Sequence, residues 1–185
     1  GADALLLVTP YYSRPTQAGI VAHCTTVANA TELPVMLYDV PERTGTAMNI
    51  DTLLELANHP KIRAVKDATG DLHQAMSVMS RSSLAYYCGV YELNLAYSAI
   101  GATGLVSVVG NLVARSNADL IEAVRDGDLV TARSIHTSML AFIEAIMRTS
   151  QGAIMAKAAL VAAGIISDAA VRSPLLQSPP EHLAR

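Results

Sequence analysis

Five short and mostly apolar runs recur along the first 108 residues, and stretches with helical spacing lie between them. The runs cover residues 5–8, 35–38, 62–66, 84–88 and 104–108. Strand, helix and strand, repeated at about the length of one βα unit, predict a parallel sheet. The composition agrees, because 51% of the residues are hydrophobic and only 16% are charged, as expected for strands that are covered on both faces.

Helical patterns fill the intervals between these runs and then the end of the chain. The predicted helices cover residues 17–30, 51–57, 72–79, 92–100, 118–125, a segment that starts after Asp128, and 154–163. Asp51 and Asp128 are the side chains that we expect to cap two of these helices. No strand is predicted after residue 108. The expected organisation is therefore a βα part at residues 1–127 and a C-terminal helical region at residues 128–185.

Two topologies fit parallel βα units, a doubly wound open sheet and a (β/α)8 barrel. The first normally carries a Gly-rich phosphate-binding loop after a strand, whereas Gly101 and Gly104 precede a strand. A barrel places reactive residues at the carboxyl ends of several strands. The residues found at such ends are Tyr11, Tyr12, Tyr38, Lys66 and Gly89. We therefore predict an α/β fold of the (β/α)8 TIM barrel type, with strands 4–8 only and a C-terminal helical appendage.

The number of strands bears on the length of the protein. Five strands do not close an eight-stranded barrel, and the first strand begins within a few residues of Gly1. We therefore expect this chain to be the C-terminal part of a longer protein, without about three βα units. Without those units the first and last strands expose hydrogen-bonding edges.

Composition and spacing argue against several classes of function. The net charge of −3, the absence of Trp and the single Phe give no reason to expect nucleic acid. The five histidines show no metal-ligand spacing, so no metal site is predicted. Cys24 and Cys88 stand far apart and in no motif, which favours reduced thiols in a cytoplasmic protein. No apolar run reaches the roughly 18 residues of a membrane span.

Lys66 and Tyr38 end two successive strands. A lysine that closes a strand inside an apolar barrel loses hydration, and its amine becomes a nucleophile. Adjacent parallel strands lie about 5 Å apart, so the Tyr38 phenol is expected near that amine, where it can move protons. The alternatives are a lysine that extends to water and a tyrosine that covers the core with its hydroxyl in solvent.

Two further groups of side chains follow strand ends. The guanidinium of Arg43, in the loop that Pro41 and Gly45 shape, suits a substrate carboxylate. A solvated loop arginine is the alternative. Tyr11 and Tyr12 form an aromatic pair after the first strand, and packing in a core or an interface is the alternative for both.

At these residues the sequence resembles the dihydrodipicolinate synthase family, which belongs to the pyruvate-dependent class I aldolases. The matching motifs are VTPYY at 8–12, LYDVPERTG at 37–45, VKDATG at 65–70 and GATGLVSV at 101–108. They occur in the order that the family shows and at close to its spacing. The resemblance covers the whole chain and is strongest up to about Asn111.

The resemblance implies a lyase of lysine (diaminopimelate) biosynthesis that condenses pyruvate with aspartate semialdehyde to 4-hydroxy-tetrahydrodipicolinate. It implies that Lys66 forms a Schiff base with pyruvate, that Tyr38 shuttles protons, and that Arg43 holds the carboxylate of the semialdehyde. No metal or organic cofactor is implied. The other residues to which the resemblance assigns substrate binding are Thr44 and Gly45 in the substrate loop, and Gly89 and Val106 in the pyruvate pocket.

The resemblance also implies an assembly. Tyr12 is expected to complete a proton relay by reaching into the active site of a partner subunit. A tight dimer follows, paired into a homotetramer. A cytoplasmic location, with no membrane or nucleic-acid partner, goes with this family.

Three departures from the family pattern keep other functions open. The Gly-Thr-Thr-Gly-Glu motif of the family's early strands is absent, and Gly89 is followed by Val90 and Tyr91 in place of an acidic pair. An asparagine of the last helices is replaced in the region 151–153. The alternatives are another pyruvate aldolase, of the sugar-acid or N-acetylneuraminate lyase type, and a non-catalytic truncated barrel.

Overall fold

The computed structural model describes residues 1–182. It divides into two compact units, Gly1–Val106 and Ser107–Arg185, and the second is described as far as His182. Within residues 1–182 no helix combines the length and the apolar character that a membrane crossing requires. The predicted boundary between a βα part (1–127) and a helical region (128–185) stays a prediction, because a division into compact units does not test it.

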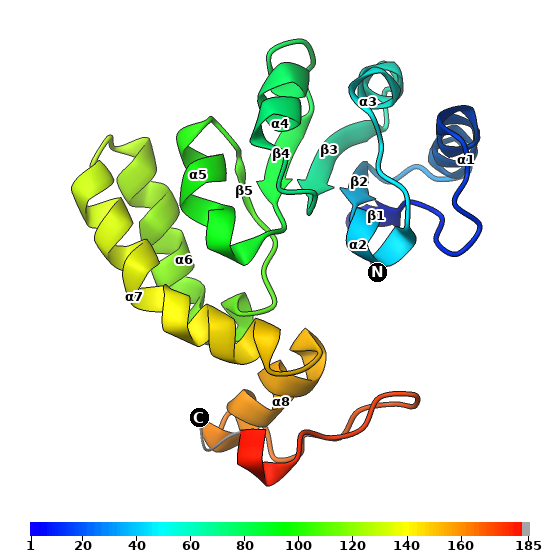
Figure 1. The fold of residues 1–185 in the computed structure, drawn as a ribbon. Helices are drawn as coiled ribbons and strands as arrows, with labels where there is room; N and C mark the ends of the chain where they lie inside the picture. The colour runs from blue at the N-terminus through cyan, green and yellow to red at the C-terminus, as the bar shows by residue number, and fades with distance from the viewer. Residues whose placement is uncertain (183–185) are drawn as a thin grey trace. The chain divides into compact units, whose positions relative to one another are not determined.

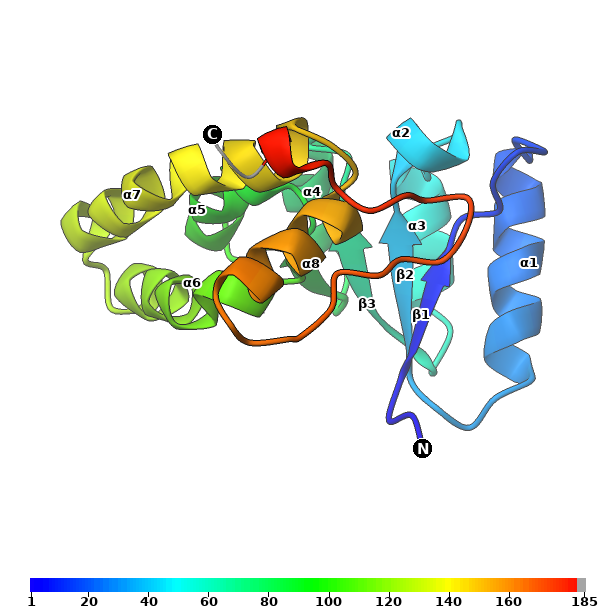
Figure 2. The same cartoon turned by 90° about the horizontal axis from the view of Figure 1, so that it is seen from below.

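The first unit is built on a parallel sheet of five strands. Its strands are β1 (Leu5–Val8), β2 (Val35–Asp39), β3 (Ile62–Asp67), β4 (Ala85–Cys88) and β5 (Gly104–Leu105). They lie side by side in chain order, and every neighbouring pair is parallel; Figure 2 shows β1, β2 and β3 pointing the same way. A doubly wound sheet reverses its strand order at a switch point. This sheet does not, so its topology is that of a barrel segment.

Helices cover one face of this sheet. They are α1 (Gln17–Asn29), α3 (Ile50–Ala57), α4 (Leu72–Met79) and α5 (Asn94–Ala99), and Figure 1 shows α1, α3 and α4 following one another along one side of the strands. Ile20, Leu53 and Val78 from these helices pack with Leu37 and Val65 in the core. We call this covered face the outer face and the opposite face the inner face.

Side chains alternate between the two faces along each strand, as the pleat requires. On β2, Leu37 and Asp39 are buried under the helices, while Met36 and Tyr38 are half-buried on the inner face. The strand register then decides which side chains are neighbours across the sheet. Tyr38 lies opposite Lys66 on β3.

Several boundaries differ from the prediction for local reasons. Asp51 does not cap α3, because the Asn49 side chain accepts the Thr52 N–H at 2.8 Å and the helix begins at Ile50. Residues 41–44 are not an open loop but a single helical turn, α2 (Pro41–Thr44), which starts at a proline and ends at Gly45 with φ +78°. A 3-10 turn, η1 (Tyr91–Leu93), precedes α5, and β5 ends at Leu105, before its predicted end.

The second unit is helical, as predicted. It contains α6 (Gly110–Arg125), α7 (Leu129–Arg148), α8 (Gly152–Ala162) and the 3-10 turn η2 (Pro180–His182), and the three helices pack on one another. Asp128 caps α7 as predicted, by accepting the Thr131 N–H at 2.9 Å. Helix α6 begins eight residues before the predicted start at 118, and Gln151 caps α8.

Candidate active site

The reactive pair of the inner face is Lys66 and Tyr38. The two residues are Cα partners in the β2–β3 ladder, and Lys66 Nζ stands 3.9 Å from the centroid of the Tyr38 ring. An ammonium over a phenol ring is a favourable electrostatic arrangement. The structure thus confirms the predicted proximity of the two side chains, while their chemical roles remain predictions.

Gly89 and Val106 lie at the ends of the next two strands, and Gly89 is beside Lys66. The Gly89 N–H donates to Asp67 O at 2.7 Å, and the Val106 N–H donates to Cys88 O at 2.9 Å. A Cβ added at Gly89 would stand 3.3 Å from Lys66 Cε and 3.0 Å from Asp67 O. The missing side chain therefore leaves the space that the lysine chain occupies.

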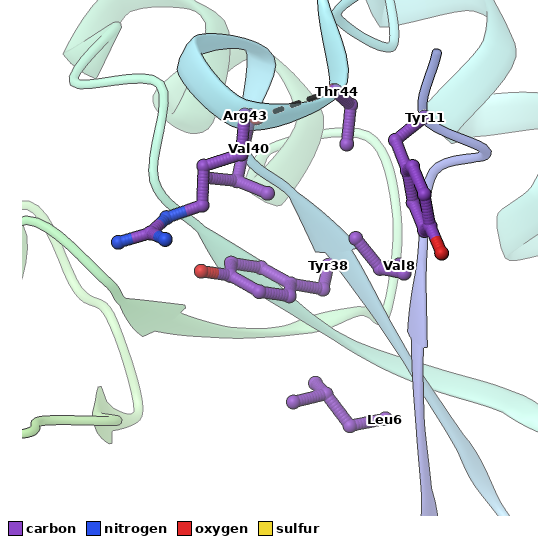
Figure 3. Close-up of a pocket in the computed structure, with 7 residues that line it drawn as sticks. All are labelled: Leu6, Val8, Tyr11, Tyr38, Val40, Arg43 and Thr44. Carbon is purple, nitrogen blue, oxygen red and sulfur yellow. Dashed lines mark hydrogen bonds between the residues drawn. The ribbon is translucent and has the colours of Figure 1, made fainter. Parts of the chain in front are cut away.

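Arg43 and Thr44 stand on the α2 turn, above Tyr38. Together they border a cavity of about 380 Å³ in the first unit. Its lining residues are Leu6, Val8, Tyr11, Tyr38, Val40, Arg43 and Thr44. Figure 3 shows the Arg43 guanidinium and the Tyr38 hydroxyl directed to the same side of this cavity. A cation and a phenol thus lie together at the border of a mostly apolar space, which suits a small ligand with one carboxylate.

The α2 turn is held in place by backbone geometry and packing. The Thr44 hydroxyl is buried and donates to Thr46 O at 2.9 Å. Gly45 ends the turn in the left-handed region, and a Cβ at this residue would stand 2.6 Å from Arg14 Nε. Gly45 therefore allows the Arg14 side chain to lie against the turn that presents Arg43.

Tyr12 is not part of this cavity. Its side chain is 95% exposed and its φ is +66°, a conformation that is uncommon for a residue with a side chain. Tyr11 is 68% exposed, yet it lines the cavity. The structure thus brings Tyr38, Lys66 and Arg43 to one region and leaves Tyr12 pointing into solvent.

Sequence reasoning missed three residues around the reactive pair. Tyr87 of β4 is the Cα partner of Lys66 on the side away from Tyr38, so the lysine lies between two tyrosine positions. Asp39 and Asp67 directly follow Tyr38 and Lys66 and point to the outer face, where they are 1% and 2% exposed. The alternation of a strand could have placed all three, but only the structure shows that the aspartates are buried.

The electrostatics of the outer face are unusual. Burial raises the pKa of Asp39 from 3.8 to about 7, the bond from the Met48 N–H lowers it, and the nearby Asp67 raises it further. Burial also raises the pKa of Asp67, against the opposing effect of hydrogen bonds from Thr69. The Cys88 thiol has its pKa raised to about 12 by burial, so it is not an activated nucleophile.

No group of three or more His, Cys, Asp or Glu side chains within 1–182 is arranged to hold a metal ion. The groups that the inner face does present are an amine, phenols and a guanidinium. Such a set can form a covalent imine, transfer protons and bind a carboxylate.

Comparisons with known proteins match the chain over its whole length. A model of the dihydrodipicolinate synthetase family matches residues 1–184. The 4-hydroxy-tetrahydrodipicolinate synthase of Kineococcus radiotolerans is 50% identical over 184 residues, which are 100% of this chain and 60% of that protein. The synthase of Acidothermus cellulolyticus is 46% identical over 100% of this chain and 59% of its own length.

Solved structures agree with these matches. The crystal structure of dihydrodipicolinate synthase from Acinetobacter baumannii complexed with pyruvate is 34% identical, with a TM-score of 0.92 over 100% of this chain and 63% of that chain. The enzyme from Aquifex aeolicus is 31% identical, also with a TM-score of 0.92. The chain thus spans about 60% of the length of the curated relatives it matches. The five-stranded sheet corresponds to part of their barrel, which confirms the predicted fold class.

Proposed function

This chain belongs to the dihydrodipicolinate synthetase family, and on that premise we propose that it carries the lysine of a lyase that condenses pyruvate with aspartate semialdehyde. The product is 4-hydroxy-tetrahydrodipicolinate, an intermediate of lysine biosynthesis. The observation that carries the proposal is the Lys66 amine, 3.9 Å from the centroid of the Tyr38 ring and close to a cavity that Tyr38 shares with Arg43.

Lys66 supplies the covalent chemistry. Its Nζ attacks the carbonyl carbon of pyruvate, the carbinolamine loses water, and an iminium forms. Loss of a methyl proton gives an enamine, whose carbon attacks the aldehyde of the acceptor and forms the new carbon–carbon bond. The amino group of the acceptor then attacks the iminium carbon, closes the ring and displaces Lys66 Nζ, which releases the cyclic product and restores the amine. The lysine itself is the electron sink, so the scheme calls for no metal or organic cofactor.

Tyr38 is the group placed to move protons in these steps. Carbinolamine formation needs a proton on the former carbonyl oxygen, and dehydration needs a second proton on the leaving hydroxyl. The Tyr38 ring already packs against the Lys66 amine. The hydroxyl at the end of this ring points to the same side as the Arg43 guanidinium (Figure 3), where we expect an adduct on Lys66 to extend.

Arg43 is the group placed to bind the acceptor. Its side chain is exposed and borders the cavity on the side of the α2 turn. A guanidinium pairs with a carboxylate through two parallel hydrogen bonds, which suits the carboxylate of aspartate semialdehyde. Thr44 and Gly45 set the shape of this turn. Gly89, which borders the lysine, and Val106, at the following strand end, are proposed to shape the pyruvate side of the site.

Tyr12 is proposed to act in a partner subunit. Tyr12 is 95% exposed and does not line the cavity of its own subunit. Such an exposed side chain can enter the active site of a neighbouring subunit. A tight dimer, paired into a homotetramer, is the assembly proposed for the whole enzyme, and a cytoplasmic location goes with it.

Trapping of the Schiff base tests the proposal. The protein is incubated with pyruvate, reduced with borohydride, and mapped by mass spectrometry. The chain has three lysines, Lys61, Lys66 and Lys157, so the other two are internal controls. We expect a single reduced pyruvyl adduct, on Lys66. A folded sample without an adduct on Lys66 contradicts the proposal, as does an adduct confined to Lys61 or Lys157.

A second candidate, another pyruvate aldolase, is favoured by one observation. Gly89 is followed by Val90 and Tyr91, where the family usually has two acidic residues. A comparison of aspartate semialdehyde, N-acetylmannosamine and glyceraldehyde as acceptors separates the two functions. Preference for a sugar aldehyde supports the second candidate, and preference for aspartate semialdehyde supports the first.

A further inference from the structure

Two aspartates lie directly behind the reactive pair. Asp39 and Asp67 are Cα partners at the ends of β2 and β3, one step after the Tyr38–Lys66 pair in the same ladder. Because side chains alternate along a strand, the aspartates occupy the outer face while Tyr38 and Lys66 occupy the inner face. Both aspartates are almost fully buried, at 1% and 2% exposed.

One oxygen of each carboxyl group accepts short hydrogen bonds, and the other oxygen accepts none. Asp39 Oδ2 accepts the Met48 N–H at 3.1 Å. Asp67 Oδ1 accepts the Thr69 N–H at 2.8 Å and the Thr69 hydroxyl at 2.7 Å. Among the described residues, no short hydrogen bond reaches Asp39 Oδ1 or Asp67 Oδ2, and the Tyr97 side chain is the further hydrogen-bond donor near Asp67. One unused oxygen on each of two neighbouring strand ends is the arrangement that a bound proton would satisfy.

No cation compensates the two carboxyl groups. Within residues 1–182, no lysine, arginine or histidine forms a salt bridge with either of them. The titratable groups that face them are Tyr86 and Cys88 of β4, Tyr97 of α5, and Asp71 before α4. All of these are neutral or acidic, so two anions at this place would be buried without a counter-charge, which is strongly unfavourable.

From this geometry we propose that Asp39 and Asp67 share one proton and that the protonated pair is a positioning device for Tyr38 and Lys66. The proton stays on the pair as a unit, as in other coupled carboxyl groups. Asp67 is the better anion, because Thr69 donates to it twice. Asp39, with one donor, is the better acid.

The pair acts on the inner face through the backbone. The Ala68 N–H donates to Asp39 O at 2.8 Å, and the Gly89 N–H donates to Asp67 O at 2.7 Å. These bonds hold the strand ends from which Tyr38 and Lys66 project. Loss of the shared proton creates a second buried anion at this point. The two anions repel each other, which strains the ladder that presents the Lys66 amine to the inner face.

Infrared difference spectroscopy tests the shared proton without any substrate. Spectra of the wild-type protein are compared between about pH 6 and about pH 8, which bracket the pKa of about 7 for Asp39. We expect a carboxylic acid C=O band at the lower pH that is lost at the higher pH. In Asp39→Asn this band is absent, and in Asp67→Asn its loss moves to lower pH because the neighbouring anion is gone. A wild-type protein without the band overturns the proposal.

Competitive labelling tests the positioning. Acetic anhydride reacts with the neutral amine, and mass spectrometry gives the labelling rate of Lys66 relative to Lys61 and Lys157. At each pH, the relative labelling rate in Asp39→Asn is divided by the relative labelling rate in the wild type. This ratio cancels the pH dependence of acetylation that any lysine shows. We expect this ratio to rise several-fold as the pH is raised across about 7, because only the wild type acquires the second anion.

A matched variant controls for the loss of one carboxylate. Asp51→Asn removes an exposed carboxylate from the first turn of α3, and its ratio should stay flat with pH. A flat ratio for Asp39→Asn, or an equal rise for Asp51→Asn, overturns the positioning role. Neither readout uses pyruvate, so a failure of this inference is distinguishable from a failure of the proposed lyase function. The inference rests on that function only for the identity of the reaction that Tyr38 and Lys66 carry out.

Discussion

The two faces of the sheet treat consecutive residues in opposite ways. On the inner face, Tyr38 and Lys66 are half-buried, and Tyr38 lines the cavity. One residue later, on the outer face, Asp39 and Asp67 are buried under helices with one unused oxygen each. Reactive groups therefore stand where a ligand can reach them, and the groups that fix the strand ends stand where water cannot. Along each strand, the reactive residue and the buried aspartate are therefore consecutive residues on opposite faces of the sheet.

The largest expected effect concerns the inner face. Tyr38→Phe keeps the ring that packs against Lys66 and removes only the hydroxyl. If Tyr38 moves protons, formation of the pyruvate adduct should slow by about 10² to 10⁴-fold, while the midpoint of urea unfolding stays nearly unchanged. Rapid-quench trapping with borohydride gives the rate. Tyr91→Phe, outside the cavity lining, is the control variant, and equal rates for Tyr38→Phe and wild type would remove Tyr38 from the mechanism.

The next effect belongs to the outer face and appears in stability. The folded-state pKa of Asp39, about 7, lies above its ordinary value of 3.8. Between these values the folded protein holds a proton that the unfolded chain has lost, so stability falls as the pH rises through this window and levels off above it. At about 1.4 kcal/mol per pKa unit, the fall is at most about 4 kcal/mol.

Asp39→Asn removes this dependence. Urea unfolding is measured between about pH 4 and about pH 8. The free energy of unfolding of the variant minus that of the wild type should increase with pH up to about pH 7. Asp51→Asn should differ from the wild type by a constant amount. A parallel pair of curves for Asp39→Asn and wild type would mean that the outer face holds no proton.

Arg43→Ala separates acceptor binding from formation of the pyruvate adduct on the inner face. Loss of a charge-assisted pair with the acceptor carboxylate costs about 1.5–3 kcal/mol, or roughly 10 to 100-fold in kcat/KM for aspartate semialdehyde. The pyruvate adduct on Lys66 should form at an almost unchanged rate, because Arg43 lies on the α2 turn rather than beside the amine. Arg63→Ala, at an exposed position on β3, serves as the control. Equal losses in adduct formation and acceptor use contradict the role of Arg43.

The smallest effect tests how tightly the strand ends are packed. A Cβ at Gly89 would stand 3.0 Å from the backbone oxygen of Asp67 and 3.1 Å from Ala68 Cβ, the two residues that follow Lys66. Gly89→Ala should lower the free energy of unfolding by about 1–3 kcal/mol and slow adduct formation. Gly104→Ala is the milder control, because its Cβ meets only the Tyr87 ring, at 3.3 Å. No difference between the two variants would argue against tight packing at Gly89.

The inner face was predictable from the sequence for physical reasons. Apolar runs that end at Tyr38 and Lys66, repeated at βα spacing, place both side chains at one end of a parallel sheet. The strand alternation and the register then leave little freedom, and the predicted proximity was right. The helical turn at 41–44 was missed, because a single turn has too few residues to show a period.

The outer face was not predictable in the same way. Asp39 and Asp67 look like ordinary polar residues that follow strands, and such residues are mostly exposed. Their burial depends on α3, α4 and α5, and on the register that sets the two carboxyl groups side by side. The cap of α3 was misassigned for a related reason, since Asn49 and Asp51 are both good cap residues and only the backbone decides between them.

The crystal structure of the borohydride-trapped pyruvate adduct would show Lys66, Tyr38 and Arg43 around the bound ligand at once. We expect the pyruvyl group to be bonded to Lys66 Nζ, within hydrogen-bond reach of the Tyr38 hydroxyl and on the side that Arg43 faces. Asp39 and Asp67 should remain paired and buried behind it. A pyruvyl group on Lys61 or Lys157 would contradict the covalent role of Lys66. A Tyr38 hydroxyl turned away from an adduct on Lys66 would contradict proton transfer by Tyr38.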